Sequence, residues 1–132
     1  MNNEWSFKIE LRNPEIFKEI EDKYDVEFPD SLKEFIVLNN AASPNLNCVN
    51  INGIERVYAE TLSFNEDEEE ALTFSYVMDT IKNFKYIPFA VDPFGNYFCY
   101  ALDKDTISYY EHEENVFSDT ELSLGEFIDS LY

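Results

Sequence analysis

The sequence predicts an α+β fold: an N-terminal helix pair, a mostly antiparallel central sheet with an inserted helix, and a closing C-terminal helix. Three observations support this class. Residues 86–103 have the pattern of a β-hairpin. Residues 14–38 carry two apolar stripes at helical spacing. Residues 122–131 begin with a helix-capping pattern.

The predicted central hairpin consists of two apolar runs, 86–91 and 96–102, on either side of the cluster Asp92-Pro93-Phe94-Gly95-Asn96. Proline presets φ, glycine supplies a positive φ, and aspartate and asparagine bond their own backbone, so this cluster is typical of a turn. Neither run has a solvent-facing charge. We therefore expect both strands to lie centrally in the sheet, with its two faces covered by the rest of the chain.

The N-terminal segment 1–12 is predicted to form a short strand or an ordered arm, because its apolar residues alternate with polar ones. A helix should follow, with Asn13 as the N-cap and Pro14 in the first helical position. The apolar stripe of this helix consists of Ile16, Phe17, Ile20 and Tyr24.

A second helix is expected to begin at Pro29, with Asp30 near the positive end of the helix dipole. Its inward face consists of Leu32, Phe35, Ile36 and Leu38. Asn39 and Asn40 are predicted to end the helix in a left-handed conformation. Residues 41–47 should form a loop.

The middle of the chain should contain a second hairpin, in which Asn52-Gly53 joins strands 48–51 and 54–58. Residues 59–70 lose apolar periodicity and become acidic, which predicts a surface loop. Residues 71–84 fit the inserted helix, whose apolar stripe consists of Leu72, Tyr76, Val77 and Ile81.

After the central hairpin, a turn at 103–105 and a strand at 106–111 are predicted, followed by a second acidic loop at 112–121. The closing helix has a capping box, formed by Ser123 and Glu126, and a hydrophobic staple. The staple pairs Leu122 with Phe127. The apolar stripe of this helix consists of Leu124, Phe127, Ile128 and Leu131.

The composition indicates one folded domain over residues 1–132, because 45% of the residues are hydrophobic and 17% are aromatic. Nine basic residues stand against 28 acidic ones, which gives a formal net charge of −19. Such a charge repels nucleic acid and anionic membranes and attracts basic partners. The sequence therefore predicts a basic protein partner, with no nucleic acid and no membrane.

No enzyme activity is predicted. His112 is the only histidine, and we expect it to lie exposed among glutamates while Cys99 packs in a strand, so the two should not form a catalytic pair. With three glycines and no zinc or EF-hand spacing, the chain offers no recognisable phosphate loop or metal site, so no cofactor is expected. Cys48 and Cys99 are expected to be free buried thiols, although the sequence leaves a disulfide open.

The N-terminus lacks the basic and apolar regions of a signal peptide, and no run approaches the roughly 18 apolar residues of a membrane span. These features predict a cytoplasmic protein. They leave its oligomeric state open.

Acidic residues concentrate in two segments, 66–70 and 111–121. Runs of charged residues are commonly solvated loops. Here an acidic run occurs twice, and the net charge exceeds what solubility requires, so a binding role is favoured. The candidate partner-binding residues are Glu66, Asp67, Glu68, Glu69, Glu70, Glu111, Glu113, Glu114 and Asp119.

Three motifs occur in a familiar order. Val26-Glu27-Phe28-Pro29 joins the helix pair, the hairpin contains Ile87-Pro88-Phe89-Ala90, Asp92 and Gly95-Asn96, and Ser123-Leu124-Gly125-Glu126-Phe127 begins the closing helix. Over residues 14–132 this pattern resembles the SUKH superfamily of the SMI/KNR type. Phe28 stands where the family has leucine, and Asn40-Ala41 stands where the family usually has two glycines.

The resemblance implies an α+β fold without enzyme activity. Many small bacterial members look like immunity proteins that bind and neutralise a cognate polymorphic toxin, often a nuclease. Nuclease clefts are basic because they hold phosphate, so an acidic domain without catalytic groups suits such a partner. The alternative is a non-enzymatic intracellular scaffold or adaptor, the role of fungal members.

Overall fold

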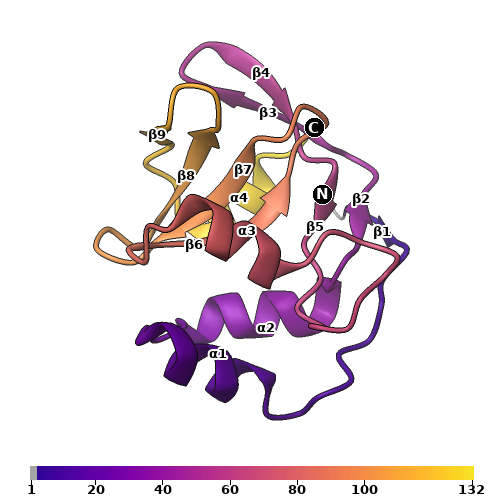
Figure 1. Cartoon of the computed structure of the whole chain (residues 1–132). Helices are drawn as coiled ribbons and strands as arrows, with labels where there is room; N and C mark the ends of the chain where they lie inside the picture. Colours follow the sequence, from indigo (N-terminus) through magenta and orange to yellow (C-terminus); the bar gives the residue numbers. More distant parts are fainter. Residues whose placement is uncertain (1–2) are drawn as a thin grey trace.

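A five-stranded antiparallel sheet lies at the centre of the computed structural model, which describes residues 3–132 (Figure 1). The strand order is β5-β6-β7-β8-β9, so neighbours in the sheet are also neighbours in sequence. The strands are β5 Glu60–Thr61, β6 Tyr86–Val91, β7 Tyr97–Ala101, β8 Thr106–Glu111 and β9 Val116–Asp119. The predicted α+β class is confirmed.

The four helices surround this sheet. Figure 1 shows α1 (Ile16–Tyr24) and α2 (Asp30–Asn39) paired below it, α3 (Phe74–Ile81) in front and α4 (Leu124–Asp129) behind. Two small sheets complete the fold: β1 (Trp5–Ser6) pairs with β2 (Ser43–Pro44), and β3 (Cys48–Ile51) pairs with β4 (Ile54–Val57).

The central hairpin is confirmed. β6 and β7 are joined by the turn 92–96, and β7 is buried along its whole length. Aromatic rings from distant segments meet on one face of this hairpin. The Phe98 ring lies 5.5 Å from the Tyr58 ring and 5.4 Å from the Phe127 ring of α4. Because its uncharged strands bury both faces, the hairpin forms the centre of the core.

The closing helix also begins as predicted. The Ser123 hydroxyl accepts a hydrogen bond from the Glu126 amide, and the Glu126 carboxylate accepts one from the Ser123 amide. The second hairpin is confirmed too, and Asn52 and Gly53 have φ values of 53° and 84°. Cys48 and Cys99 are free thiols, but Cys48 is only partly buried.

The first helix starts later than predicted. Pro14 and Glu15 form a turn, and α1 begins at Ile16, because the Asn13 carboxamide oxygen bonds the Glu15 amide in a local turn instead of capping a helix. In the second helix, Pro29 is the N-cap and not the first helical residue. The N-terminal strand is limited to Trp5–Ser6 and leaves Phe7 exposed; residues 1–2 of the predicted arm lie outside the described part of the chain.

The end of the second helix was predicted wrongly. Asn40 has a φ of −55°, and the left-handed residue is Ala41, with a φ of 62°. Asn40 is fully buried, and its side chain accepts a hydrogen bond from the Phe64 amide and donates one to the Ile9 carbonyl. Leu38 points outward and is 65% exposed. Left-handed residues also follow α1 at Asp25 and α3 at Lys82.

Three predicted loops and one predicted helix face differ from the structure. The predicted loop 41–47 contains β2, and the predicted loop 112–121 contains the edge strand β9. The predicted loop 59–70 is buried from Thr61 to Asn65 and contains β5, and its exposed residues are Glu66, Asp67, Glu69 and Glu70. In α3, Tyr76 is exposed, and the buried residues are Phe74, Val77 and Met78.

Candidate interaction surface

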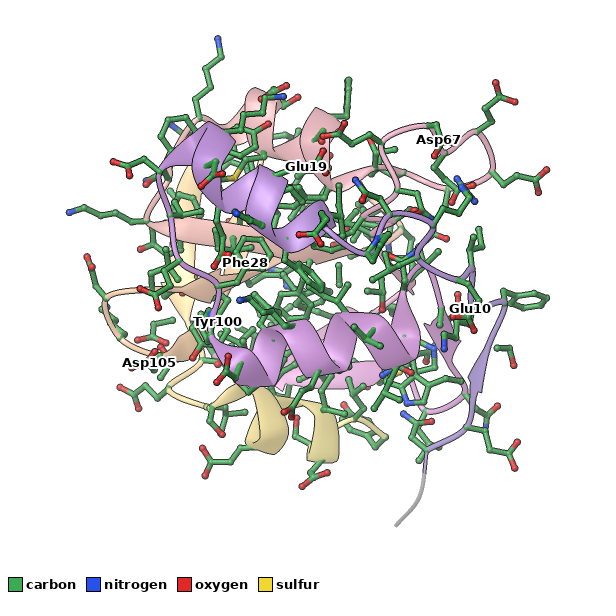
Figure 2. The ribbon with its side chains drawn as sticks, turned by 90° about the horizontal axis from the view of Figure 1, so that it is seen from below. Glu10, Glu19, Phe28, Asp67, Tyr100 and Asp105 are labelled. Atoms are coloured by element: carbon green, nitrogen blue, oxygen red, sulfur yellow. The ribbon has the colours of Figure 1, made fainter. Side chains whose placement is uncertain are left out.

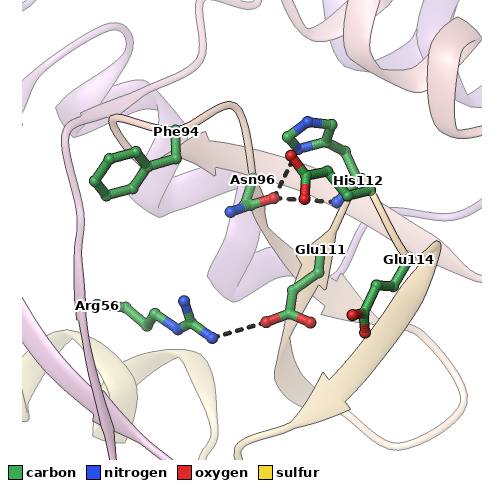
Figure 3. A pocket seen from close by; sticks show the side chains of 7 residues that line it. Arg56, Phe94, Asn96, Glu111, His112 and Glu114 are labelled. Atoms are coloured by element: carbon green, nitrogen blue, oxygen red, sulfur yellow. Dashed lines mark hydrogen bonds and ion pairs between the residues drawn. The ribbon is translucent and has the colours of Figure 1, made fainter.

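A pocket of about 270 Å³ lies where the β6–β7 turn meets the β8–β9 turn (Figure 3). It is called the turn pocket below, and it is lined by Arg56, Phe94, Asn96, Glu111, His112, Glu113 and Glu114. Three of the candidate acidic residues therefore lie together with groups from two other segments. Its residues come from β4, the central hairpin and the end of β8.

The floor of this pocket is held by Asp92. Its carboxylate accepts hydrogen bonds from the Phe94 and Asn96 amides, both at 2.8 Å, and from the Tyr109 hydroxyl. Gly95 has a φ of 82°, which suits glycine. The turn is therefore fixed from within, and it presents the Phe94 ring to solvent at 76% exposure.

Arg56 links the pocket to the small β3–β4 sheet. Its guanidinium donates to the Glu111 carboxylate at 2.7 Å (Figure 3) and lies 4.6 Å from the centre of the Tyr109 ring. Burial, and next the hydrogen bond to Asp92, raise the pKa of Tyr109, so this hydroxyl remains a donor at neutral pH. Glu111 is thus neutralised locally and fixed in place.

His112 is held by Asn96. The Asn96 side-chain oxygen accepts from the His112 amide at 3.0 Å and lies 2.8 Å from the ring Nδ1. Cys99 is fully buried in β7, and burial raises the pKa of its thiol, which keeps it protonated. The Cys99 thiol therefore lacks the exposure and the thiolate character of a reactive cysteine.

Glu113 and Glu114 are the free charges of the turn pocket. Both are exposed, and within residues 3–132 neither takes part in an ion pair. Figure 3 shows Glu114 beside Glu111 on the β8–β9 side, with Phe94 on the opposite side of the pocket. The arrangement offers an exposed aromatic ring, carried by a hydrogen-bonded turn, across the pocket from two available carboxylates.

The acidic segment 66–70 is built differently. Asp67 pairs with Arg12 at 2.8 Å, which lowers the pKa of this carboxyl, chiefly through the hydrogen bond. Glu68 has a side chain only 5% exposed and accepts from the Ser63 hydroxyl at 2.9 Å. Burial alone would raise the pKa of Glu68, but hydrogen bonds from Ser63 and the Glu70 amide outweigh it and lower the value. These two acids anchor the loop.

The remaining members of this segment, Glu66, Glu69 and Glu70, are exposed and have no ion pair within the described residues. Asp119 belongs to the anchored group: it accepts from the Thr106 hydroxyl at 2.8 Å and pairs with Lys104 at 3.5 Å. Burial opposes ionisation of Asp119, but hydrogen bonds from the Glu121 amide and Thr106 lower its pKa.

The structure does not bring the two acidic segments together. In Figure 1 the chain between β5 and α3 lies at the lower right, and the turn between β8 and β9 lies at the upper left. Separate pockets adjoin them, since Glu66 and Asp67 line a pocket with Arg12 and Asn13 that shares no residue with the turn pocket. The candidate acids therefore divide into two surfaces.

Four residues that line the turn pocket, Arg56, Phe94, Asn96 and His112, were not among the candidates at the sequence level. Phe94 had a detectable signal, because an aromatic residue between Pro93 and Gly95 in a two-strand turn has no core to enter. Arg56 had none: its pairing with Glu111 joins residues 55 positions apart, and no local pattern predicts it.

Comparison with known families decides the relationship. The family described as SUKH_6, SMI1-KNR4 cell-wall, matches residues 14–128. The chain belongs to this family. The resemblance predicted from the helix pair, the central hairpin and the closing helix is thereby confirmed. A search of curated proteins found no match.

Membership of the SUKH family is consistent with a non-enzymatic immunity or scaffold protein that acts through protein partners. Within residues 3–132, no helix is long and apolar enough to cross a membrane. Among the same residues, no three histidine, cysteine, aspartate or glutamate side chains gather in an arrangement that could hold a metal ion.

Proposed function

We propose that this protein is an immunity protein that binds and neutralises a cognate toxin, a basic nuclease domain, in the cytoplasm. SUKH membership supports an immunity-type role, and the net charge of −19 supports a basic partner. A nuclease cleft is basic because it binds phosphate, so an acidic surface can occupy it. A protein that inhibits a nuclease by filling its cleft needs no catalytic residues of its own.

The observation that carries the proposal is the turn pocket. Interface hot spots are commonly aromatic residues surrounded by polar groups, and rigid presentation lowers the entropy lost on binding. Phe94 fits this description, since hydrogen bonds to Asp92 fix its turn and Glu113 and Glu114 line the same pocket. We place Phe94 at the centre of the interface, with the two glutamates directing the approach of the partner.

The test begins with the partner itself, isolated from the native host by affinity capture and identified by mass spectrometry. Its association rate is then measured against ionic strength for wild type and three charge-reversed variants. E113K/E114K alters the turn pocket, E69K/E70K alters the exposed part of the other acidic segment, and E15K/D22K changes the same charge at two exposed positions, one at the N-cap of α1 and one within it.

We expect E113K/E114K to slow association about tenfold or more at low salt, with the difference fading at high salt. Equal slowing by E15K/D22K would indicate that association depends on the net charge of the protein and not on a particular binding surface. Slowing only by E69K/E70K would move the interface to the 66–70 segment. Phe94→Ala should mainly speed dissociation, because it removes a short-range contact.

The competing function is a scaffold or adaptor, which family membership also accommodates. The two functions differ in the identity of the captured partner and in the effect of binding on the activity of that partner. A captured nuclease whose activity falls on addition of this protein supports the immunity proposal. A captured regulatory protein whose activity is unchanged by binding would overturn it in favour of the scaffold.

A further inference from the structure

A second groove, of about 550 Å³, lies at the end of the molecule where α2 begins. Three segments form it: the α1–α2 connection 25–30, residues 84–85 before β6, and the β7–β8 turn 102–105. Figure 2 shows Phe28, Tyr100 and Asp105 at this end and Asp67 at the opposite end. The groove shares no residue with the turn pocket.

The groove has an apolar floor. It contains Phe84, Phe28, Val26 and Leu102, and the Phe84 ring is 48% exposed. This ring is held in place, because it packs against the Tyr24 ring of α1 at 5.6 Å. An aromatic face that is both fixed and open to solvent can stack with a guanidinium or cover the aliphatic stem of a long side chain.

The rim of the groove is strongly acidic. Its carboxylates belong to Asp25, Glu27, Asp30, Asp103 and Asp105, against the single lysine Lys85. Lys85 approaches Asp103 at 3.8 Å, and Asp105 accepts from the Tyr100 hydroxyl at 3.0 Å. Within residues 3–132, Asp25, Glu27 and Asp30 have no ion pair and are exposed, so their charges are available to a ligand.

We propose that this groove binds an arginine-rich or lysine-rich peptide segment of a partner protein, with a basic side chain stacked on Phe84 and its charge directed to the acidic rim. Charge complementarity selects this occupant: an acidic peptide is repelled by the rim, and a second copy of the chain carries the same net charge of −19. The proposal does not depend on the partner being a toxin, because the groove is separate from the turn pocket.

The test is a titration of the full chain with two synthetic peptides of equal length, one of alternating arginine and glycine and one of alternating glutamate and glycine. Backbone amide chemical shifts report both the affinity and the residues involved. We expect the arginine peptide to bind, with the largest shifts at Val26, Glu27, Phe84 and Asp103, and the glutamate peptide to leave the spectrum unchanged.

Three variants decide the result. E27K/D103K, which reverses one charge on each wall, should weaken binding of the arginine peptide about tenfold or more. E69K/E70K has the same net charge and leaves the groove intact, so it should weaken binding much less. Phe84→Ala should weaken binding of the arginine peptide at high salt, where stacking persists and long-range attraction is screened.

Several outcomes would overturn the proposal. Equal weakening in E27K/D103K and E69K/E70K would mean that the peptide responds only to the overall charge. Binding of the glutamate peptide, or self-association that E27K/D103K alters, would assign the groove to another occupant. The probes are defined peptides and not the toxin. If the arginine peptide does not bind the groove, the proposed toxin binding is unaffected, and if no toxin is found, binding of the peptide to the groove still holds.

Discussion

Two acidic surfaces of this protein have similar composition but different construction. In the segment 66–70, the Asp67 carboxylate pairs with Arg12, and the Glu68 carboxylate accepts a hydrogen bond from Ser63. The Glu68 side chain is also nearly buried. In the turn 111–114, only Glu111 is neutralised, while Glu113 and Glu114 remain exposed. A run of carboxylates in a sequence therefore does not reveal which charges hold the fold and which are available to a partner.

The difference arises from what lies beneath each loop. The segment 66–70 rests on a buried polar network that includes Asn40, Ser63 and Asn65. The turn 111–114 follows a strand of the central sheet and is joined to the turn held by Asp92, because the Asn96 side-chain oxygen accepts a hydrogen bond from the His112 amide. Reversing Asp67, Glu68 and Glu69 together would disturb the fold, whereas Glu113 and Glu114 can be changed independently of it.

The largest effect is expected beneath the first surface. Asn40→Leu removes the acceptor for the Phe64 amide and the donor to the Ile9 carbonyl in a fully buried site. Buried groups left without partners cost roughly 1–3 kcal/mol each, so the free energy of unfolding should fall by about 3 kcal/mol. Urea denaturation measures this. A loss below about 0.5 kcal/mol would show that water or a local shift replaces both bonds.

Glu68→Ala should be the next largest change. It leaves the buried Ser63 hydroxyl without its acceptor and removes the nearby charge from Arg12, at an expected cost of about 2 kcal/mol. Chemical denaturation at neutral pH, with Glu69→Ala as the matched exposed control, checks this. Equal costs for the two variants would mean that the segment 66–70 is uniformly solvated.

The same residue gives a pH dependence of known sign. The pKa of Glu68 is lowered in the folded state from its ordinary value of 4.5, since hydrogen bonds outweigh the opposing effect of burial. Its contribution is therefore present above pH 4.5 and is lost as the pH falls through the folded value. The stability difference between wild type and Glu68→Gln should shrink below that pH.

A smaller effect is expected beneath the second surface. Gly95→Val places a β-branched residue at a φ of 82°, although its Cβ would meet His112 only at an ordinary 3.7 Å. Backbone strain alone should cost about 1–2 kcal/mol. Gly125→Val provides a comparison, since that helical glycine has open space around it and no positive φ. If Gly95→Val leaves the denaturation midpoint unchanged, the turn is not held in the left-handed conformation.

The smallest effect is expected for the exposed acids of the turn pocket. Glu113→Gln combined with Glu114→Gln should change the free energy of unfolding by less than about 0.5 kcal/mol, because surface substitutions without partners rarely do more. Thermal and chemical denaturation should both agree. A loss above about 1 kcal/mol would place these side chains among the groups that hold the fold, as Glu68 does.

The elements that the sequence predicted best are those whose signals are local. The central hairpin has its turn chemistry within five residues, and the closing helix has its capping box within four, so tertiary contacts only reinforce them. The segment 59–65 was misread as a surface loop because Ser63 and Asn65 are polar, yet both are buried. Their partners Asn40 and Glu10 are distant in sequence, which no local pattern reveals.

The candidate surface was predicted only in part, for the same reason. Charge counting found the acidic residues but could not separate Glu68 or Asp119 from the exposed ones, since that depends on Ser63, Thr106 and Lys104. The edge strand β9 was missed because its four residues follow an acidic turn and carry little apolar periodicity. Whether the exposed acids bind a partner stays a prediction.

The left-handed residues that follow the helices have a consequence for changing this molecule. Ala41 and Lys82 have φ values of 62° and 56°, a conformation that costs an L-amino acid about 1 kcal/mol or more. Glycine at these positions would relieve that strain in the folded state. It would also raise the conformational entropy of the unfolded chain, which lowers the free energy of unfolding by a similar amount. Lys82 is exposed and lines neither the turn pocket nor the groove beside α2, so it offers a protein engineer a site for a label or cross-link, whereas Ala41 is buried and does not.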